Sequence, residues 1–252
     1  MLLKDKVVLV TGGGRGIGAA ICRVLAREGA IVAVNYAASQ AKAERVVGEI
    51  TEAGGQAAAF GADVRDAAAV EGMVAAVRGR FGRIDAVVNN AISGPQSGTL
   101  DKVTADDYRN SFDYGCLAVI NTIGAVRPAF REQGGGGGIV NIVTELWNMA
   151  PAGWSVYMAG KGAMVGLSRS LASELGPEGI TVNMVAPGWM ADEKVDTTSD
   201  GSKNFAAALP LRRHGSADEI GNACAFLLSD LATYITGAYI PVTGGRVTQT
   251  GV

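Results

Sequence analysis

The sequence predicts an α/β fold: a single doubly wound Rossmann-type domain over residues 1–252, with a seven-stranded parallel sheet and helices on both faces. Short apolar runs alternate with segments of helical periodicity along the whole chain, which favours parallel strands joined by right-handed helical crossovers. The length of 252 residues, 48% of them hydrophobic, suffices for one large core. A glycine-rich turn follows the first apolar run, in the position where such folds bind nucleotides.

The N-terminal half supplies the first four strands. The segment KVVLVTG (6–12) has the continuous β-branched character of a strand buried on both faces. An amphipathic helix follows at 16–29 and closes at its last residue, a glycine. Further strands are expected at 30–36, 57–64 and 84–91, with helices at 41–55 and 66–82 between them.

The C-terminal half continues the alternation. A helical stretch of about 104–132 ends at GGGGG (134–138), which is too short for a domain linker and predicts a surface loop. Strands are expected at 139–144, 181–187 and 234–245, with helices at 155–176 and 217–230.

Composition excludes several classes of protein. The net charge of −2 indicates no nucleic-acid partner, and no apolar run reaches the ~20 residues of a membrane span. The N-terminus lacks the apolar region of a secretory signal, so we expect a cytoplasmic protein. Cys22, Cys116 and Cys224 lie far apart, as free thiols do in a reducing compartment. The single histidine, His214, lies in a charged loop-like stretch and is interpreted as solvated, without a role in a Ser-His-Asp triad or a metal site.

The turn TGGGRGIG (11–18) predicts a phosphate site. Glycines at a helix N-terminus let backbone N–H groups approach a pyrophosphate, helped by the helix dipole, and Gly18 allows close helix packing. The glycine spacing differs from the commoner GxGxxG, so a plain tight turn is the competing interpretation. The candidate ligands in this turn are Gly12, Gly14, Arg15, Gly16, Ile17 and Gly18.

The end of the second strand bears on the choice of cofactor. It reads VNYAAS (34–39), without the acid that accepts from the ribose 2′-OH of NAD. Arg15 could pair with a 2′-phosphate, so NADP(H) is preferred over NAD(H). Asp63 could accept from the adenine amino group, or could cap the helix at 66–82. The candidate ligands here are Asn35, Tyr36, Ser39, Asp63 and Val64.

Tyr157 and Lys161 stand four residues apart, so they share one face of a helix. An ammonium beside a phenol favours the phenolate and would lower the tyrosine pKa. Such a tyrosine can exchange a proton with an alcohol at neutral pH. Taken alone, this spacing also fits two exposed residues of a helix that have no catalytic role.

Six motifs together resemble the short-chain dehydrogenase/reductase family, in its order and over essentially the whole chain. The nearest branch is the 3-oxoacyl-(acyl-carrier-protein) reductases, which residues 211–230 also resemble. The motifs are TGGGRGIG (11–18), ADV (62–64), VVNNA (87–91), YMAGK (157–161), NMVAPG (183–188) and TGAYIPVTGG (236–245).

The resemblance implies roles for individual residues. Tyr157 would be the proton donor in reduction of a ketone, and Lys161 would hold the nicotinamide ribose. Residues 189–212 would form a variable substrate loop, and the two long helices would build a homotetramer or dimer. Further residues implied at the cofactor are Asn90 and Ala91 by the adenosine-side ribose, and Pro187, Gly188 and Met190 by the nicotinamide.

Two departures from the family pattern leave the function open. Its catalytic serine, 13 residues before the tyrosine, is Thr144 here, whose hydroxyl can still donate or accept. The asparagine of its D-x-N pattern is Gly115. We expect an NADPH-dependent reductase of a small-molecule ketone, with a 3-oxoacyl thioester as the first substrate candidate. The alternatives are an NADP(H)-binding sensor or partner subunit with little turnover, and an isomerase, dehydratase or lyase on the same scaffold.

Overall fold

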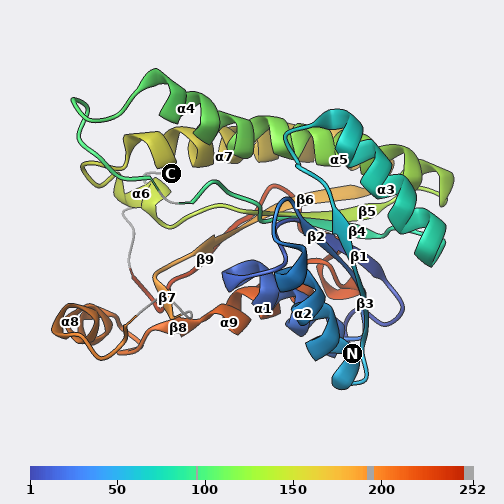
Figure 1. Ribbon diagram of the computed structural model, residues 1–252, viewed down its shortest axis with the longest axis horizontal. Helices are drawn as coiled ribbons and strands as arrows, with labels where there is room; N and C mark the ends of the chain where they lie inside the picture. The colour runs from blue at the N-terminus through green and yellow to red at the C-terminus, as the bar shows by residue number, and fades with distance from the viewer. Residues whose placement is uncertain (95, 192–195, 247–252) are drawn as a thin grey trace.

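A seven-stranded parallel sheet forms the centre of the molecule, in the order β3-β2-β1-β4-β5-β6-β9 (Figure 1). The computed structural model describes residues 1–94, 96–191 and 196–246. The predicted fold class is confirmed, and the strand order reverses between β1 and β4, where such sheets bind ligands. The strands are β1 (Val7–Val10), β2 (Ile31–Tyr36), β3 (Gln56–Gly61), β4 (Ala86–Asn89), β5 (Gly137–Ile142), β6 (Ile180–Pro187) and β9 (Tyr239–Val242).

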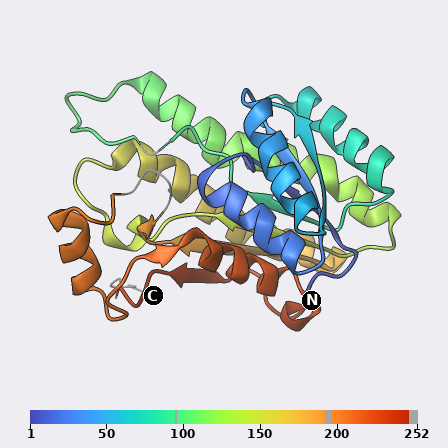
Figure 2. The same ribbon diagram turned by 60° about the horizontal axis from the view of Figure 1, so that its bottom comes forward.

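Helices cover both faces of the sheet, and each face has its own apolar core. On one face α1 and α9 lie side by side, with Gly221 against Val24 (Figure 2). On the other face α3, α5 and α7 pack over residues such as Leu9 and Val87. The helices are α1 (Gly16–Arg27), α2 (Gln40–Glu52), α3 (Ala67–Phe81), α4 (Ala105–Phe112), α5 (Ala118–Glu132), α7 (Ser155–Leu175) and α9 (Ala217–Leu227).

The predicted long helix at 104–132 is interrupted. A π-helical turn, η1 (Asp113–Leu117), separates α4 from α5. In a π-helical turn each hydrogen bond spans five residues instead of the four of an α-helix. The spacing of apolar residues in the sequence does not show such a local change. The η1 turn carries Gly115 and brings it against α7.

The segment between β6 and α9 contains structure that the sequence did not predict. Its elements are the strands β7 (Met190–Ala191) and β8 (Gly215–Ser216), which pair with each other, and the helix α8 (Asp200–Ala208). Three short helical pieces were also missed: α6 (Leu146–Met149), η2 (Gly176–Glu178) and η3 (Asp230–Ala232). These elements gather near the carboxyl ends of the strands, except for η2 and η3.

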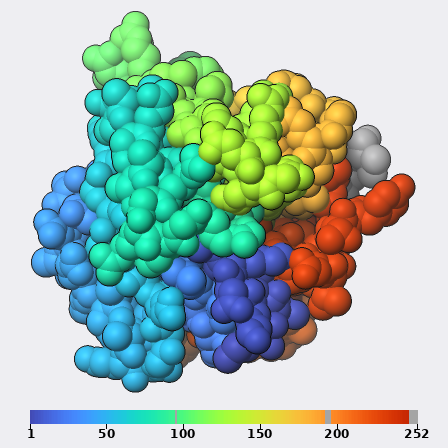
Figure 3. Space-filling view, turned by 90° about the vertical axis from the view of Figure 1, so that its right-hand side faces the viewer, coloured from blue at the N-terminus to red at the C-terminus, as the bar shows by residue number. Residues whose placement is uncertain are grey.

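The residues that precede β1, β4, β5 and β6 lie together at the opposite end of the molecule, which faces the viewer in Figure 3. There the N-terminal segment, the glycine run before β5 and the residues near η3 pack together around a hollow that includes Lys6, Gly136 and Thr233. Within the ranges described, no helix is long and apolar enough to cross a membrane.

A buried chain of polar side chains fixes α7 to the sheet. Asn89 Nδ2 donates to Asn141 Oδ1 at 2.8 Å, and Asn141 Nδ2 donates to Ser168 Oγ at 2.7 Å. Ser168 in turn donates to the carbonyl of Met164 at 2.6 Å. Because a buried polar group costs free energy unless it is hydrogen-bonded, this chain holds α7 in one place and with it the residues of its first turns.

Candidate active site

The turn between β1 and α1 presents a set of free backbone donors. Gly12 and Gly16 have positive φ values of 63° and 51°. A Cβ at Gly18 would lie 2.3 Å from the Gly12 carbonyl oxygen, so only glycine fits there. The amides of residues 14–18 donate to no other residue in the described part of the chain. Unpaired N–H groups at a helix N-terminus suit the phosphates of a nucleotide.

Two asparagines brace this turn from either side. Asn35 Oδ1 accepts from the Gly12 amide at 3.2 Å, while its Nδ2 donates to the Ala62 carbonyl at 3.0 Å. Asn90 Nδ2 donates to the carbonyls of Thr11 and Gly12 at 3.0 and 3.2 Å. Both side-chain amides therefore act within the fold, and their contact with a nucleotide stays a prediction.

Arg15 and Ser39 lie at the outer end of the turn. Arg15 is the exposed N-cap residue of α1, and Ser39 is the exposed N-cap residue of α2 without a capping bond from its side chain. Gly14, which precedes Arg15, packs against the first turn of α2, where an added Cβ would lie 3.2 Å from the Ala43 nitrogen. The guanidinium and the hydroxyl are thus both available to a ligand at the end of β2.

Asp63 does not cap a helix. The N-cap residue of α3 is Asp66, whose side chain accepts from the Ala69 amide at 3.1 Å, so the capping interpretation of Asp63 is wrong. Arg65 donates to both oxygens of Asp63 at 2.6–3.2 Å and lowers the pKa of that carboxyl. The adenine contact of Asp63 stays a prediction.

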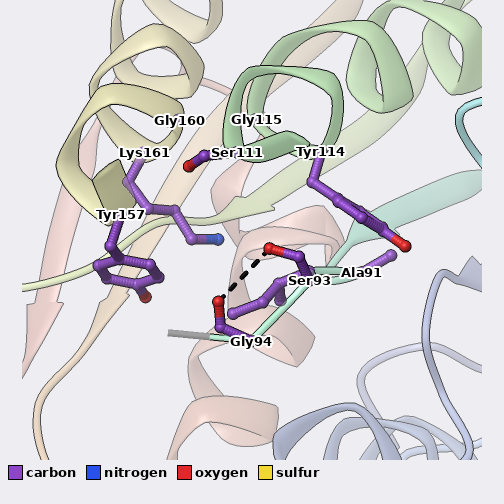
Figure 4. Close-up of a pocket in the computed structure, with 10 residues that line it drawn as sticks. Ala91, Ser93, Gly94, Ser111, Tyr114, Gly115, Tyr157, Gly160 and Lys161 are labelled. Atoms are coloured by element: carbon purple, nitrogen blue, oxygen red, sulfur yellow. Dashed lines mark hydrogen bonds between the residues drawn. The ribbon is translucent and has the colours of Figure 1, made fainter. Parts of the chain in front are cut away.

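Thr144, Tyr157 and Lys161 meet at the carboxyl end of the sheet. Thr144 follows β5 and is buried, and its side chain is close enough to Tyr157, in the first turn of α7, to act to lower the pKa of the phenol. Tyr157 and Lys161 project from α7 into one pocket, with Ala91 and Ser93 across from them (Figure 4). Lys161 is buried, and its Nζ donates to the Ile142 carbonyl at 2.5 Å.

Burial controls the electrostatics of this pair. It lowers the pKa of Lys161 to about 8 and raises the pKa of Tyr157, and only the hydrogen bond with Thr144 acts to lower the latter. The prediction that Lys161 lowers the Tyr157 pKa is therefore wrong for this structure. The ammonium is directed to the Ile142 carbonyl, and desolvation of the phenol outweighs its hydrogen bond.

Comparisons with known proteins agree with this geometry. A family model described as enoyl-(acyl carrier protein) reductase matches residues 12–246. The 3-oxoacyl-[acyl-carrier-protein] reductase FabG of Staphylococcus aureus is 40% identical over 241 residues, which cover 95% of this chain and 97% of that protein. A short-chain dehydrogenase/reductase from Serratia marcescens is 36% identical, with a TM-score of 0.89 and coverage of 97% and 99% of the two chains.

The chain belongs to the short-chain dehydrogenase/reductase family. It is an NAD(P)-dependent oxidoreductase, near the 3-oxoacyl reductase branch. A short-chain dehydrogenase from Burkholderia cenocepacia, solved in complex with NADP, is 36% identical, with a TM-score of 0.88 and coverage of 97% and 99% of the two chains.

The π turn explains why this member of the short-chain dehydrogenase/reductase family has no asparagine at Gly115. A Cβ on Gly115 would lie 2.0 Å from the carbonyl oxygen of Gly160, so the two helices touch backbone to backbone. Asn121 does not compensate, because its Nδ2 donates to the Val64 carbonyl at 3.1 Å. Ser111 is a polar residue of the same pocket as Lys161, and its hydroxyl donates to the Val156 carbonyl at 2.7 Å. No motif identified Ser111 beforehand.

The end of β6 and the residues that follow it contact the segments after β5 and β9. The Pro187 carbonyl accepts from the Glu145 amide at 3.1 Å, and Gly188 packs against Thr243. Met190 is buried in β7. Residues 192–195 of the predicted substrate loop lie outside the described residues.

His214 is not a solvated loop residue, as the sequence suggested. Its ring stacks on Phe205 of α8 at 5.3 Å between centroids and meets Trp189 at 5.2 Å. Its Nε2 lies 2.7 Å from Ser202 Oγ, and its Nδ1 lies 3.2 Å from the Trp189 carbonyl oxygen. His214 therefore holds α8 to the residues that follow β6.

Restoring the family asparagine should damage this enzyme. We expect Gly115→Asn to lower the free energy of unfolding by about 3 kcal/mol or more, because its side chain would overlap the Gly160 backbone. Urea unfolding measures the loss. The matched control is Gly124→Asn in α5, where an added Cβ meets nothing within 4 Å. Equal stability changes in the two variants would contradict the proposed overlap.

Proposed function

We propose that this protein reduces a ketone to a secondary alcohol with NADPH, and that Tyr157 donates the proton. The observation that carries the proposal is the meeting of Thr144, Tyr157 and Lys161 at the same sheet edge as the turn with free amides. A 3-oxoacyl thioester is the substrate to test first, because FabG of S. aureus is named a 3-oxoacyl reductase.

Each residue has a distinct part in the reaction. Bound NADPH supplies a hydride to the carbonyl carbon. Tyr157 gives its phenolic proton to the carbonyl oxygen, and its raised pKa keeps the phenol protonated at neutral pH. The Thr144 hydroxyl holds that oxygen as a donor. Lys161, when charged, would hold the nicotinamide ribose of the cofactor by charge-assisted donation from its ammonium.

Three features support NADP(H) as the cofactor. The free amides of residues 14–18 form a cradle for the pyrophosphate, and the exposed Arg15 and Ser39 can reach a 2′-phosphate at the end of β2. The segment 34–39 offers no carboxylate to the ribose. The B. cenocepacia relative was solved in complex with NADP.

Exposed apolar side chains support self-association, as a homotetramer or a dimer. Phe112, Leu117 and Ile120 lie along α4, η1 and α5 and are 41–46% exposed. Large apolar side chains grouped on one surface commonly mark an interface.

Removal of the phenolic proton should abolish turnover. We expect Tyr157→Phe to lower kcat by about 10²–10⁴-fold in NADPH oxidation with a panel of ketones headed by an acetoacetyl thioester. Tyr234→Phe, at a fully exposed tyrosine, is the control. If the unmutated protein binds NADPH tightly but reduces no ketone of the panel, the result would contradict the reductase function and favour an NADP(H)-binding sensor.

Arg15 should decide between the two cofactors. We expect Arg15→Ala to weaken NADPH binding by about 10–100-fold and to leave NADH binding unchanged, since a lost charge-assisted bond costs ~1.5–3 kcal/mol. Arg23→Ala, at an arginine paired with Glu49, is the control. Fluorescence titration with each cofactor measures this. Equal losses for NADPH and NADH would show that Arg15 does not contact the 2′-phosphate.

Reduction should slow as the solution becomes basic. The pKa of Lys161 is lowered to about 8, so its charge is present below that pH and is lost above it. We expect kcat/KM to fall about tenfold per pH unit beyond this midpoint, because kcat/KM reports groups of the free enzyme. Arginine stays protonated, so Lys161→Arg should move the fall to higher pH. If kcat/KM of Lys161→Arg decreases at the same pH as in the parent enzyme, the decrease is caused by a group other than Lys161.

A further inference from the structure

Glu145 is a buried carboxylate directly after Thr144, and the chemistry proposed above does not use it. Its side chain is only 4% exposed, and burial raises its pKa. Its Oε2 has no hydrogen-bond partner among the residues described. A carboxylate in such a place is costly unless it is paired, so its surroundings should show what it stabilises.

The carboxylate lies close to the carboxyl ends of β5 and β6. Its backbone N–H donates to the carbonyl of Pro187, the last residue of β6, and its Oε2 is 3.3 Å from where a Cβ on Gly188 would lie. From β9, Tyr239 donates its hydroxyl to the Thr144 carbonyl at 2.8 Å. Burial and the nearby Glu145 charge raise the pKa of Tyr239 to about 12, which keeps that hydroxyl a donor. Glu145 therefore lies between two backbone segments of the site. Its carboxylate is beside Gly188, and its neighbour Thr144 is held through the carbonyl by Tyr239.

Arg246 is the counter-charge and leads outward to α8. Its Nη1 donates to Glu145 Oε1 at 3.1 Å. Its guanidinium lies over the ring of Phe205 in α8, 5.1 Å from the centroid. Phe205 in turn packs on Trp189 at 4.8 Å. An unbroken set of contacts thus runs from the Thr144 backbone to α8.

We propose that Glu145 is a positioning residue that, through Arg246, couples the docking of α8 to the placement of Thr144 and the Pro187–Gly188 turn. Undocking of α8 would remove Phe205 from Arg246 and loosen the only counter-charge that the described residues give the buried carboxylate. An unpaired buried charge is strongly unfavourable, so the carboxylate favours the docked arrangement. The proposal rests on the reductase function proposed above.

The test uses two readouts in full-length protein. Kinetics with NADPH and the active ketone give kcat and KM separately. For α8, Trp147→Phe and Trp154→Phe leave Trp189 as the only tryptophan, so its emission reports the contact with Phe205. The variants are Glu145→Gln, Arg246→Met, their combination, and Arg246→Lys, which keeps the charge. Arg78→Met and Glu132→Gln break an exposed 2.6 Å ion pair far from the site and are the matched controls.

We expect each single variant to lower kcat by ~10–100-fold with little change in the KM for NADPH, because catalytic groups are misplaced. Trp189 emission should shift to the red by the same amount in Glu145→Gln and in Arg246→Met. The double variant should have the same kcat and the same emission as Glu145→Gln and Arg246→Met, since the Glu145–Arg246 ion pair is broken in all three. Arg246→Lys keeps the charge and should recover part of kcat. The control variants should change neither readout.

Two results would overturn the proposal. One is unchanged Trp189 emission and kcat in Arg246→Met, a variant that removes a side chain one third exposed and so leaves the core intact. The other is losses in kcat that add in the double variant. If the parent enzyme turns over no ketone, the reductase function fails, while Trp189 emission still decides whether Glu145 and α8 are coupled.

Discussion

The hydrogen bonds of Asn90 join the turn after β1 to the end of β4, and the nucleotide end of the site depends on them. The Asn90 amide satisfies the Thr11 and Gly12 carbonyls, while Asn35 satisfies the Gly12 amide from the β2 side. With its first residues held from both sides, the turn can leave the next five amides without partners. Without these bonds the turn could rearrange so that its unpaired N–H groups found acceptors. The two asparagines therefore stabilise the conformation in which the amides of residues 14–18 stay free for an anion.

Close backbone contact shapes both ends of the site. Gly18 lies against Gly12 in the glycine-rich turn, and Gly115 lies against Gly160 in the pocket that Tyr157 and Lys161 line. The second contact excludes the family asparagine, so Lys161 is held by the Ile142 carbonyl and α7 by the chain of buried amides from β4 and β5. This enzyme therefore positions its lysine mainly through the sheet.

The sequence predicted what local spacing determines. Runs of apolar residues follow burial, so all seven strands of the sheet were found, and the shared helix face of Tyr157 and Lys161 follows from helical geometry. It did not predict what distant segments determine together. The π turn responds to packing on Gly160, and His214 and Glu145 take their partners from α8 and from Arg246. The Tyr157 pKa was predicted wrongly because burial, which spacing does not show, raises it by more than the hydrogen bond with Thr144 lowers it.

Burial shifts the titratable groups of the chemical end toward their neutral forms. The pKa of Tyr157 and that of Glu145 are raised, and the pKa of Lys161 is lowered. All three follow from one cause, the poor solvation of charge away from water. At the nucleotide end the cation of Arg15 is solvated. The molecule thus separates an exposed charge that can attract phosphate from a dry region, where a phenol that keeps its proton at neutral pH can release it only to an oxygen that is becoming negative.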